Sequence, residues 1–345
     1  MARSSTTYPR KWKSGKTTVI RVPELIADEL LEIAQQLDDQ RSLRVRSEPS
    51  RLILEATPSE DAIYSSSEPV NVASVPQRSP FRYPGGKTWL IPYIRAWLRS
   101  RRSRPSRLIE PFAGGAIVSL TVAFEALAKH VVFAELDEGV AAVWRVILNG
   151  HAEWLADQIV NFDLTLENAR RVLAKRSDEL KEKAFQTILR NRVQRGGIMA
   201  LGAGLIKAGE NGRGIKSRWY RETLARRIRE INLLKDRLSF IEGDGLALIA
   251  EHEADADAVF YVDPPYTVAA RRLYSKWEID HVKLFSAMQS CKGDFLMSYD
   301  NTVEISELAK RCSFDTRAIA MKNTHHAKMT ELLIGKDLSW LAAEQ

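Results

Sequence analysis

Short apolar runs alternate with helical periodicity over most of this 345-residue chain. Runs of four or five mostly apolar residues between turn residues predict buried strands, and apolar residues spaced three and four apart predict helices. Helices are predicted at 88–99 and 117–128, on either side of the first strand. The predicted strands cover residues 107–110, 131–134, 238–241, 258–262, 294–298 and 331–334. Strands that alternate with helices indicate an α/β domain with a mainly parallel sheet.

The pattern also divides the chain into four parts. Residues 1–56 predict a short strand and an amphipathic helix, an order that loosely resembles a ribbon-helix-helix DNA-binding arm; a small docking or dimerising arm is the alternative. Residues 57–78 form a linker rich in Ser, Glu and Pro. The α/β domain is expected at 79–149 and 238–345, interrupted by a mostly helical, basic insertion at 150–237.

Charge and composition narrow the class of protein. Residues 190–237 hold 13 Lys and Arg against 4 Asp and Glu, so the net charge of +7 is concentrated there and fits a polyanionic partner. The longest apolar region, 113–136, is broken by charged residues, and the N-terminus has no apolar signal segment. Neither a membrane span nor secretion is therefore expected. Two cysteines without metal-ligand spacing indicate reduced thiols and a cytoplasmic location.

An unusual tetrapeptide, Asp263-Pro264-Pro265-Tyr266, follows the fourth predicted strand. Because proline has no N–H, the Pro-Pro step leaves carbonyl oxygens and the Asp263 carboxylate as acceptors without competing donors. Tyr266 adds a flat ring beside them. The group suits a planar ligand that carries an exocyclic amine, although Asp-Pro and Pro-Pro are also common turn formers.

A second constellation suits a nucleoside. The first predicted strand leads into a turn that contains Phe112, Gly114 and Gly115, which brings the backbone close to a ligand at the sheet edge. Glu135 ends the next strand, where a carboxylate can accept both hydroxyls of a ribose. Asp244 follows the third strand and could hold an adenine amino group. The absence of a dinucleotide fingerprint and of a P-loop argues against NAD and ATP.

A Pro-Gly-Gly turn lies upstream of these motifs, between Tyr83 and Lys87. An aromatic residue, a turn and a lysine suit the carboxylate of an amino acid. The alternative is a plain turn before the helix predicted at 88–99.

Four of these elements, in this order, resemble the Dam-like (alpha group) DNA adenine-N6 methyltransferases over residues 79–338: the Pro-Gly-Gly-Lys turn, the Glu-Pro-Phe-Ala-Gly turn, the acid after the second strand and the Asp-Pro-Pro-Tyr sequence. The resemblance implies a Rossmann-like class I methyltransferase sheet, S-adenosylmethionine (SAM) as cofactor and the insertion as target recognition region. The implied catalytic residues are Asp263, Pro264, Pro265 and Tyr266. The implied cofactor contacts are Tyr83, Lys87, Phe112, Gly114, Gly115, Glu135, Asp244 and Asp263.

Three positions depart from the family pattern. Tyr83 stands where the first aromatic is often Trp, and Glu135 stands where the ribose acid is often Asp, with Asp137 as a rival. Ala116 occupies the usual place of the second turn glycine. No catalytic group is lost, but the departures leave the cofactor affinity open.

The mechanism implied by the resemblance is methylation of a flipped-out adenine in double-stranded DNA. Tyr266 would stack on the base, while Asp263 and the Pro264 carbonyl would accept the two N6 hydrogens. No metal is expected. The partners expected are DNA and, within a restriction-modification system, a paired nuclease; the protein is expected to be a monomer unless the arm self-associates.

In the insertion, arginine and asparagine are the side chains best suited to read guanine and adenine, although most such residues contact phosphates. The DNA-binding residues predicted are Asn191, Arg192, Arg195, Lys207, Asn211, Arg213, Lys216 and Arg218.

Four other functions stay open on the sequence. Cytosine-N4 methylation shares the amine chemistry, although such enzymes often have Ser in place of Asp263. Methylation of RNA adenine or of protein glutamine would more often show Asn there. A non-catalytic DNA-binding regulator could also retain the fold, but the intact tetrapeptide and Lys87 argue against it.

Overall fold

The computed structural model describes residues 75–82, 86–199, 203–209, 212–265, 279–322 and 328–341. The chain divides into two compact units, Met1–Glu60 and Asp61–Gln345, and every described residue belongs to the second. The arm predicted at 1–56 and most of the linker therefore lie outside the described residues. Their roles stay predictions.

A single β-sheet is the centre of the second unit. Within the described residues its seven strands are β1 (Arg107–Glu110), β2 (His130–Glu135), β3 (Leu238–Glu242), β4 (Ala258–Val262), β5 (Asp294–Asp300), β6 (Asp315–Lys322) and β7 (Lys328–Gly335). They lie in the order β3-β2-β1-β4-β5-β7-β6. β1 to β5 pair in parallel, whereas β7 is antiparallel to both β5 and β6.

Helices fill the connections. The α-helices are α2 (Ile91–Arg99), α3 (Ile117–Phe124), α4 (Glu138–Val146), α5 (Ala152–Asn161), α6 (Leu166–Ala174), α7 (Leu180–Val193), α8 (Arg221–Asn232), α9 (Gly245–His252), α11 (His281–Ser290) and α12 (Val303–Arg311). Shorter helical turns are η4 (Lys87–Leu90), η5 (Ile147–His151), η6 (Arg195–Gly197), η8 (Gly214–Arg218) and η9 (Lys235–Arg237).

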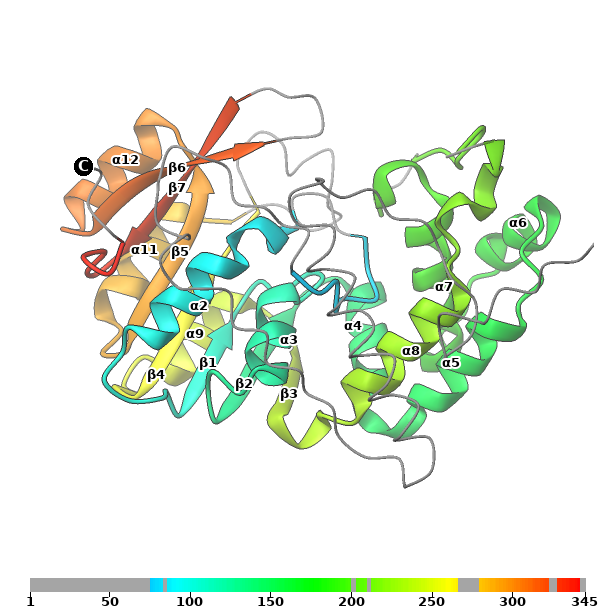
Figure 1. The fold of residues 1–345 in the computed structure, drawn as a ribbon, viewed down its shortest axis with the longest axis horizontal. Coiled ribbons are helices and arrows are strands. Elements are labelled where there is room, and N and C mark those ends of the chain that lie inside the picture. The colour runs from blue at the N-terminus through cyan, green and yellow to red at the C-terminus, as the bar shows by residue number, and fades with distance from the viewer. Residues whose placement is uncertain are drawn as a thin grey trace, which may run out of the picture. The chain divides into compact units, whose positions relative to one another are not determined.

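Apolar side chains cover both faces of the sheet, because neighbouring strand residues point to opposite sides. On β4, Tyr261 belongs to the core that includes Trp97 of α2 and Trp144 of α4. Its neighbour Phe260 belongs to the other core, with Phe285 of α11. Figure 1 shows α2 and α3 on one side of the strands and α9 and α11 on the other. Strands buried on both faces explain the continuous apolar runs in the sequence.

The predicted α/β fold with a Rossmann-like sheet is confirmed. All six predicted strands are present, and the sequence missed only β6 among the described strands. β6 lies at the sheet edge and begins with three polar residues, Asp315-Thr316-Arg317, which gives a weaker signal than a run that is apolar throughout. The helix predicted at 117–128 ends at Phe124, because Ala126 has a left-handed backbone with φ 52°.

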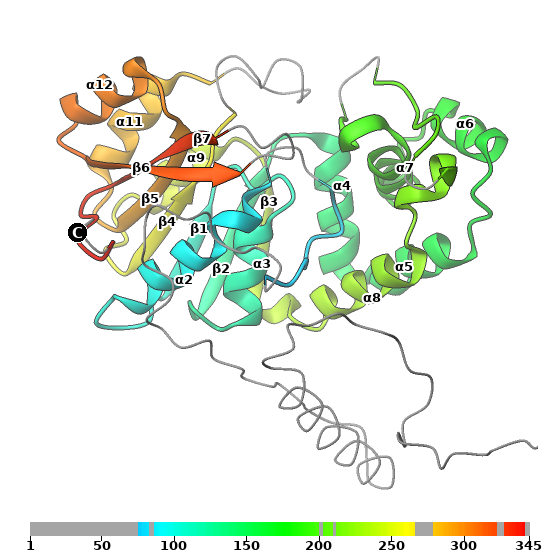
Figure 2. The same cartoon turned by 45° about the horizontal axis from the view of Figure 1, so that its top comes forward.

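The helices predicted in the insertion are also present. Buried apolar residues join them, among them Leu155 of α5, Ile188 of α7 and Ile228 of α8. Figure 2 shows α5, α7 and α8 gathered beside α4, which follows β2. Whether residues 150–237 act as a separate recognition domain stays a prediction. None of the described helices combines the length and the apolar character needed to cross a membrane.

Candidate active site

The carboxyl ends of the parallel strands meet at one edge of the sheet. The strand order reverses between β1 and β4, and in open α/β sheets ligands bind at such a switch point. Glu110 ends β1, Glu135 ends β2, Asp300 ends β5, and Asp263 directly follows β4. Four carboxyl groups from four strands therefore lie at the edge where a ligand is expected.

Asp263 and Lys87 form an ion pair at this edge. The Lys87 Nζ atom lies 3.1 Å from Asp263 Oδ1, and the lysine side chain is only 4% exposed. The Pro-Gly-Gly-Lys turn and the Asp-Pro-Pro-Tyr sequence, 176 positions apart at these two residues, are thus brought together. Lys87 was predicted as a cofactor contact, and the structure places its ammonium beside the predicted catalytic acid.

Glu331 on β7 is a site residue that the sequence did not indicate. Its carboxylate accepts from Lys87 Nζ at 3.2 Å, and its side chain is 7% exposed. It lies directly opposite Asp300 in the β5–β7 pairing, which brings it to the same edge. The sequence did offer one signal: Glu331 is a charged residue at the start of a strand predicted to be apolar and buried. A buried charge needs a partner, so its presence there indicates an ion pair.

Carboxyl groups outnumber cations at this edge. Burial alone would lower the pKa of Lys87, but the Asp263 and Glu331 charges outweigh it and raise that pKa, so the amine stays an ammonium. Burial raises the pKa of Glu331 and that of Asp300 as well, although Lys87 opposes both shifts. Burial also raises the pKa of Glu110 to about 8. Glu110 therefore tends to keep its proton at neutral pH, and a cation bound at this edge would favour the ionised forms of Glu331 and Asp300.

The glycine turn after β1 is held in place by two neighbours. Gly114 donates its N–H to Glu135 Oε2 at 2.9 Å, and its carbonyl accepts from Trp144 Nε1 at 3.1 Å. Gly114 and Gly115 are both buried. Ala116, in place of the family's glycine, adopts a left-handed backbone with φ 51°, which costs an L-residue about 1–2 kcal/mol. Alanine at this position therefore preserves the turn, but the Ala116 backbone is strained.

The backbone contacts distinguish Glu135 from its rival, Asp137. Glu135 accepts from three backbone N–H groups, those of Gly114, Leu136 and Asp137, and its side chain is half-buried at the strand end. Asp137 Oδ1 accepts from the N–H groups of Gly139 and Val140 and caps α4. Burial raises the pKa of Glu135 to about 7, although the backbone donors favour its ionised form.

Phe112 and Asp244 lie close together through Gly245. A side chain at Gly245 would meet the Phe112 ring at 2.6 Å, so only glycine fits there. Asp244 is exposed and caps α9 by accepting from the Leu246 N–H. The glycine turn after β1 and the acid after β3 therefore meet.

Some predicted residues cannot be placed. Tyr83 and Tyr266 lie outside the described residues, as does Asn211. Pro264 is buried and Pro265 is half-buried beside Asp263.

Two predicted DNA-binding residues, Asn191 and Arg192, are buried in α7, at 0% and 3% exposure, and the prediction is corrected for both. Asn191 accepts from the Arg82 N–H at 2.8 Å and donates to the carbonyls of Arg82 and Gly197 at 2.9 and 3.1 Å. Arg192 donates to the Pro80 carbonyl. Both side chains anchor the segment before the Pro-Gly-Gly-Lys turn to the insertion instead of facing solvent.

Replacing Asn191 with alanine is expected to destabilise the protein by about 3 kcal/mol, because three backbone groups each lose a buried hydrogen bond. Thermal unfolding should show a melting temperature lowered by several degrees. Lys207→Ala removes an exposed side chain from the same insertion and should leave it unchanged. Equal stability of the Asn191→Ala and Lys207→Ala proteins would contradict this anchoring role.

The other predicted DNA-binding residues lie at the surface. Arg195, Lys207, Arg213 and Lys216 are exposed, and Arg218 is half-buried. Within the described part of the chain, none of the four exposed cations forms an ion pair. An unneutralised group of cations on one segment fits a polyanion.

A second basic run lies at 95–107, where the sequence holds six arginines, and it differs from the insertion. Arg95 pairs with Glu125, Arg101 with Asp294 and Arg107 with Asp255, at 2.6 to 2.7 Å. The sequence shows few acids nearby, but folding supplies them from distant positions. Half of the six arginines in this run are therefore neutralised within the protein.

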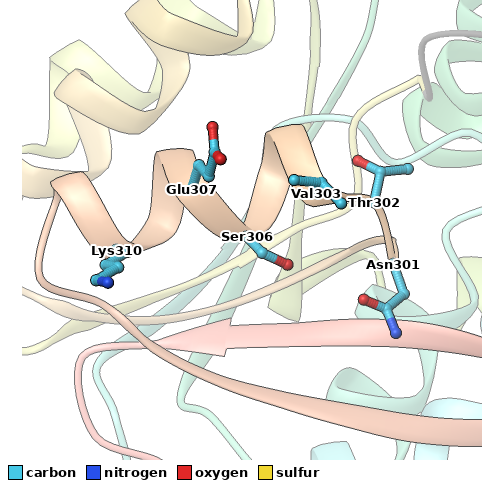
Figure 3. A pocket seen from close by; sticks show the side chains of 6 residues that line it. All are labelled: Asn301, Thr302, Val303, Ser306, Glu307 and Lys310. Atoms are coloured by element: carbon cyan, nitrogen blue, oxygen red, sulfur yellow. The ribbon is translucent and has the colours of Figure 1, made fainter.

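A pocket of about 310 Å³ opens at the start of α12, beyond the end of β5. Figure 3 shows its lining side chains, which come from the two residues just before α12 and from α12 itself as far as Lys310 in its last turn. It is lined by Asn301, Thr302, Val303, Ser306, Glu307 and Lys310. None of these is a predicted site residue, but Asn301 directly follows Asp300 at the carboxyl end of β5.

The family model of the D12 class N6 adenine-specific DNA methyltransferases matches residues 83–325, most of the chain. Among solved structures, the chain is similar to the rRNA methyltransferase aviRa from Streptomyces viridochromogenes, with 13% identity, a TM-score of 0.37, and 74% of this chain and 86% of that chain covered. It is also similar to a SAM-dependent methyltransferase from Agrobacterium tumefaciens, with 10% identity, a TM-score of 0.33, and 70% and 59% covered.

The comparison with curated proteins finds no match. Structural likenesses at TM-scores below 0.5 carry no argument about function, whereas the family match spans both the Lys87 turn and the Asp263 sequence. The chain therefore belongs to the family of D12 class N6 adenine-specific DNA methyltransferases, enzymes that take the methyl group from SAM.

Proposed function

We propose that this enzyme is a Dam-like, site-specific methyltransferase that modifies N6 of an adenine flipped out of duplex DNA. The observation that carries the proposal is the position of Asp263, which follows β4 at the switch point of the sheet and pairs with Lys87. The proposed catalytic group is Asp263, Pro264, Pro265 and Tyr266.

The charges at the site fit the cofactor. SAM carries a positive sulfonium, and the edge of the sheet holds Asp263, Glu331 and Asp300 around the single ammonium of Lys87 among the described residues. We assign the ribose hydroxyls to Glu135 and the adenine to the neighbourhood of Phe112 and Asp244. Gly114, Gly115 and Tyr83 would complete the cofactor contacts, and Lys87 would reach the cofactor from beside Asp263.

Replacing Glu135 with glutamine is expected to weaken SAM binding about 10- to 100-fold at pH 8, because a hydrogen bond to a charged acceptor contributes about 1.5–3 kcal/mol. The pKa of Glu135 lies at about 7, so its charge is present above that pH and is lost as the pH falls through it. Calorimetric titration should show that wild-type affinity falls between pH 8 and pH 6 more than that of the variant.

Asp137→Asn is the control for the ribose assignment, since Asp137 caps α4. It should leave SAM affinity within about twofold, given that surface cap changes act on helix stability. A larger loss of SAM affinity in Asp137→Asn than in Glu135→Gln would move the ribose to Asp137.

When bound, SAM supplies an electrophilic methyl group. Asp263 and the Pro264 carbonyl would accept the two N6 hydrogens of the target adenine and orient the nitrogen lone pair toward that methyl. Tyr266 would stack on the base. Asp263 need not act as a strong base, because the amine can lose its proton after attack. The main contributions of the protein are positioning and electrostatic stabilisation.

For DNA, the proposal retains the surface cations Arg195, Lys207, Arg213, Lys216 and Arg218 as contacts to the backbone phosphates. A paired restriction nuclease, a monomeric state and a cytoplasmic location are further parts of the proposal.

Base flipping is tested with duplexes in which 2-aminopurine replaces the adenine that the enzyme methylates, once that adenine is mapped. An extruded 2-aminopurine loses its stacking, so its fluorescence should rise when the enzyme binds. A control duplex carries the probe two positions away and should respond weakly. Equal responses at both positions, or methylation of single strands in preference to duplex, would contradict flipping from a duplex.

A further inference from the structure

A single oxygen of Asp263 accepts hydrogen bonds from two directions. Ser298 Oγ, on β5, lies 3.0 Å from Asp263 Oδ1, and Lys87 Nζ lies 3.1 Å from the same atom. Ser298 is 0% exposed and also lies 3.0 Å from the hydroxyl of Tyr261. We propose that Ser298 is a positioning residue for Asp263 and that Tyr261 sets the direction of the Ser298 hydroxyl. This inference rests on the proposed catalytic role of Asp263.

The sheet register places the three residues together. Val262 of β4 is paired with Met297 of β5, so the next residue of each strand, Asp263 and Ser298, lie side by side. Tyr261 precedes Asp263 by two residues and therefore points to the same face of the sheet. The parallel pairing of β4 and β5 thus fixes the distances between the three side chains of this hydrogen-bond chain, which runs from Tyr261 through Ser298 to Asp263.

The direction of the hydrogen bonds follows from the chemistry of the groups. An ionised carboxylate only accepts, so the single hydroxyl hydrogen of Ser298 must point to Asp263. The Ser298 oxygen then accepts from the Tyr261 hydroxyl. Burial raises the pKa of Tyr261 well above its ordinary value, so the phenol keeps its proton. Because Tyr261 donates to the Ser298 oxygen, the Ser298 hydroxyl hydrogen is directed to Asp263.

The two donors on Oδ1 fix the plane of the carboxylate. Rotation of Asp263 would break a charge-assisted bond to Ser298 and an ion pair to Lys87, and Lys87 is itself held by Glu331 at 3.2 Å. Ser298 is buried, so it is a positioning residue that acts on the substrate amine through Asp263. Its loss should therefore change the rate of transfer and leave ligand affinity unchanged.

The test compares Ser298→Ala, Tyr261→Phe and the double variant in single-turnover methylation, with SAM and DNA affinities measured separately. Ser298→Ala is expected to lower the transfer rate about 10- to 100-fold, the scale of a small misplacement of a reacting group. Tyr261→Phe should have a smaller effect. The double variant should be no slower than Ser298→Ala, because both hydroxyls act through one hydrogen-bond chain.

Tyr93→Phe is the matched control, since Tyr93 is a buried tyrosine on α2. It should keep the wild-type rate. Wild-type rates in Ser298→Ala would overturn the proposal, as would a loss of SAM or DNA affinity equal to the loss of rate. If the double variant lost rate by the product of the two single losses, Tyr261 would not act through Ser298, and its part of the proposal would fail. If the wild-type protein forms no N6-methyladenine, the proposed function fails instead, which separates the two outcomes.

Discussion

Replacing Asp263 with asparagine is expected to lower the rate of methyl transfer by at least about 10³-fold, while SAM and DNA still bind. The substitution keeps the shape of the side chain but removes the negative charge of the carboxylate, which accepts hydrogen bonds from Lys87 and Ser298. It also replaces one of the two acceptor oxygens of the carboxylate with an NH₂ donor, so the side chain keeps a single acceptor. The measurement is single-turnover transfer of labelled methyl from SAM, beside equilibrium binding of SAM and of duplex DNA.

The fold should survive this change, because Lys87 retains Glu331 as a partner at 3.2 Å. Asp294→Asn is the matched control. Like Asp263, Asp294 is a half-buried aspartate that pairs with a cation, here Arg101, but it begins β5 at the opposite edge of the sheet. Its rate should stay within about twofold of wild type, as for most substitutions away from a site. Full activity of Asp263→Asn would remove Asp263 from the mechanism.

Replacing Arg195, Arg213 and Lys216 together with alanine is expected to weaken DNA binding roughly 100- to 1,000-fold near 0.1 M salt. Each phosphate contact releases counterions, so losing three should reduce the slope of log K against log salt by about 2.7. SAM affinity should not change. The measurement is DNA binding by anisotropy over a series of salt concentrations.

Arg99→Ala, Arg102→Ala and Arg104→Ala, combined in one protein, remove the same charge from an exposed segment before β1. This segment lies at the opposite edge of the sheet from the carboxyl ends. Removing these three charges should change the slope of log K against log salt only slightly. Equal slopes in the two triple variants would show that net charge, and not the insertion surface, determines binding.

The strands could be predicted because parallel strands are buried on both faces and appear as short apolar runs. β4, at Ala258–Val262, is fully buried and was predicted with its observed bounds. β6 was missed because an edge strand need not be apolar. The chemistry at the strand ends followed from the same argument, since the acids Glu135 and Asp263 come directly where strands stop.

Asn191 and Arg192 were assigned to DNA by residue type, and that reasoning ignored the face of the helix. Arg192 lies four positions after the buried Ile188, so helical spacing already places it on the inner side of α7. The contact between Lys87 and Glu331 joins residues 244 positions apart, and no local pattern predicts such a pair. Only the sheet order, with β7 beside β5, reveals it.

The central claim is transfer of the SAM methyl group to N6 of adenine in duplex DNA. It is tested most directly by incubating the full-length protein with labelled SAM and unmethylated duplex DNA, digesting the DNA and identifying the labelled nucleoside. The account predicts N6-methyladenine as the product, formed by the wild type and formed at least about 10³-fold more slowly by Asp263→Asn. Label in N4-methylcytosine, or no label in DNA that the protein still binds, would contradict it.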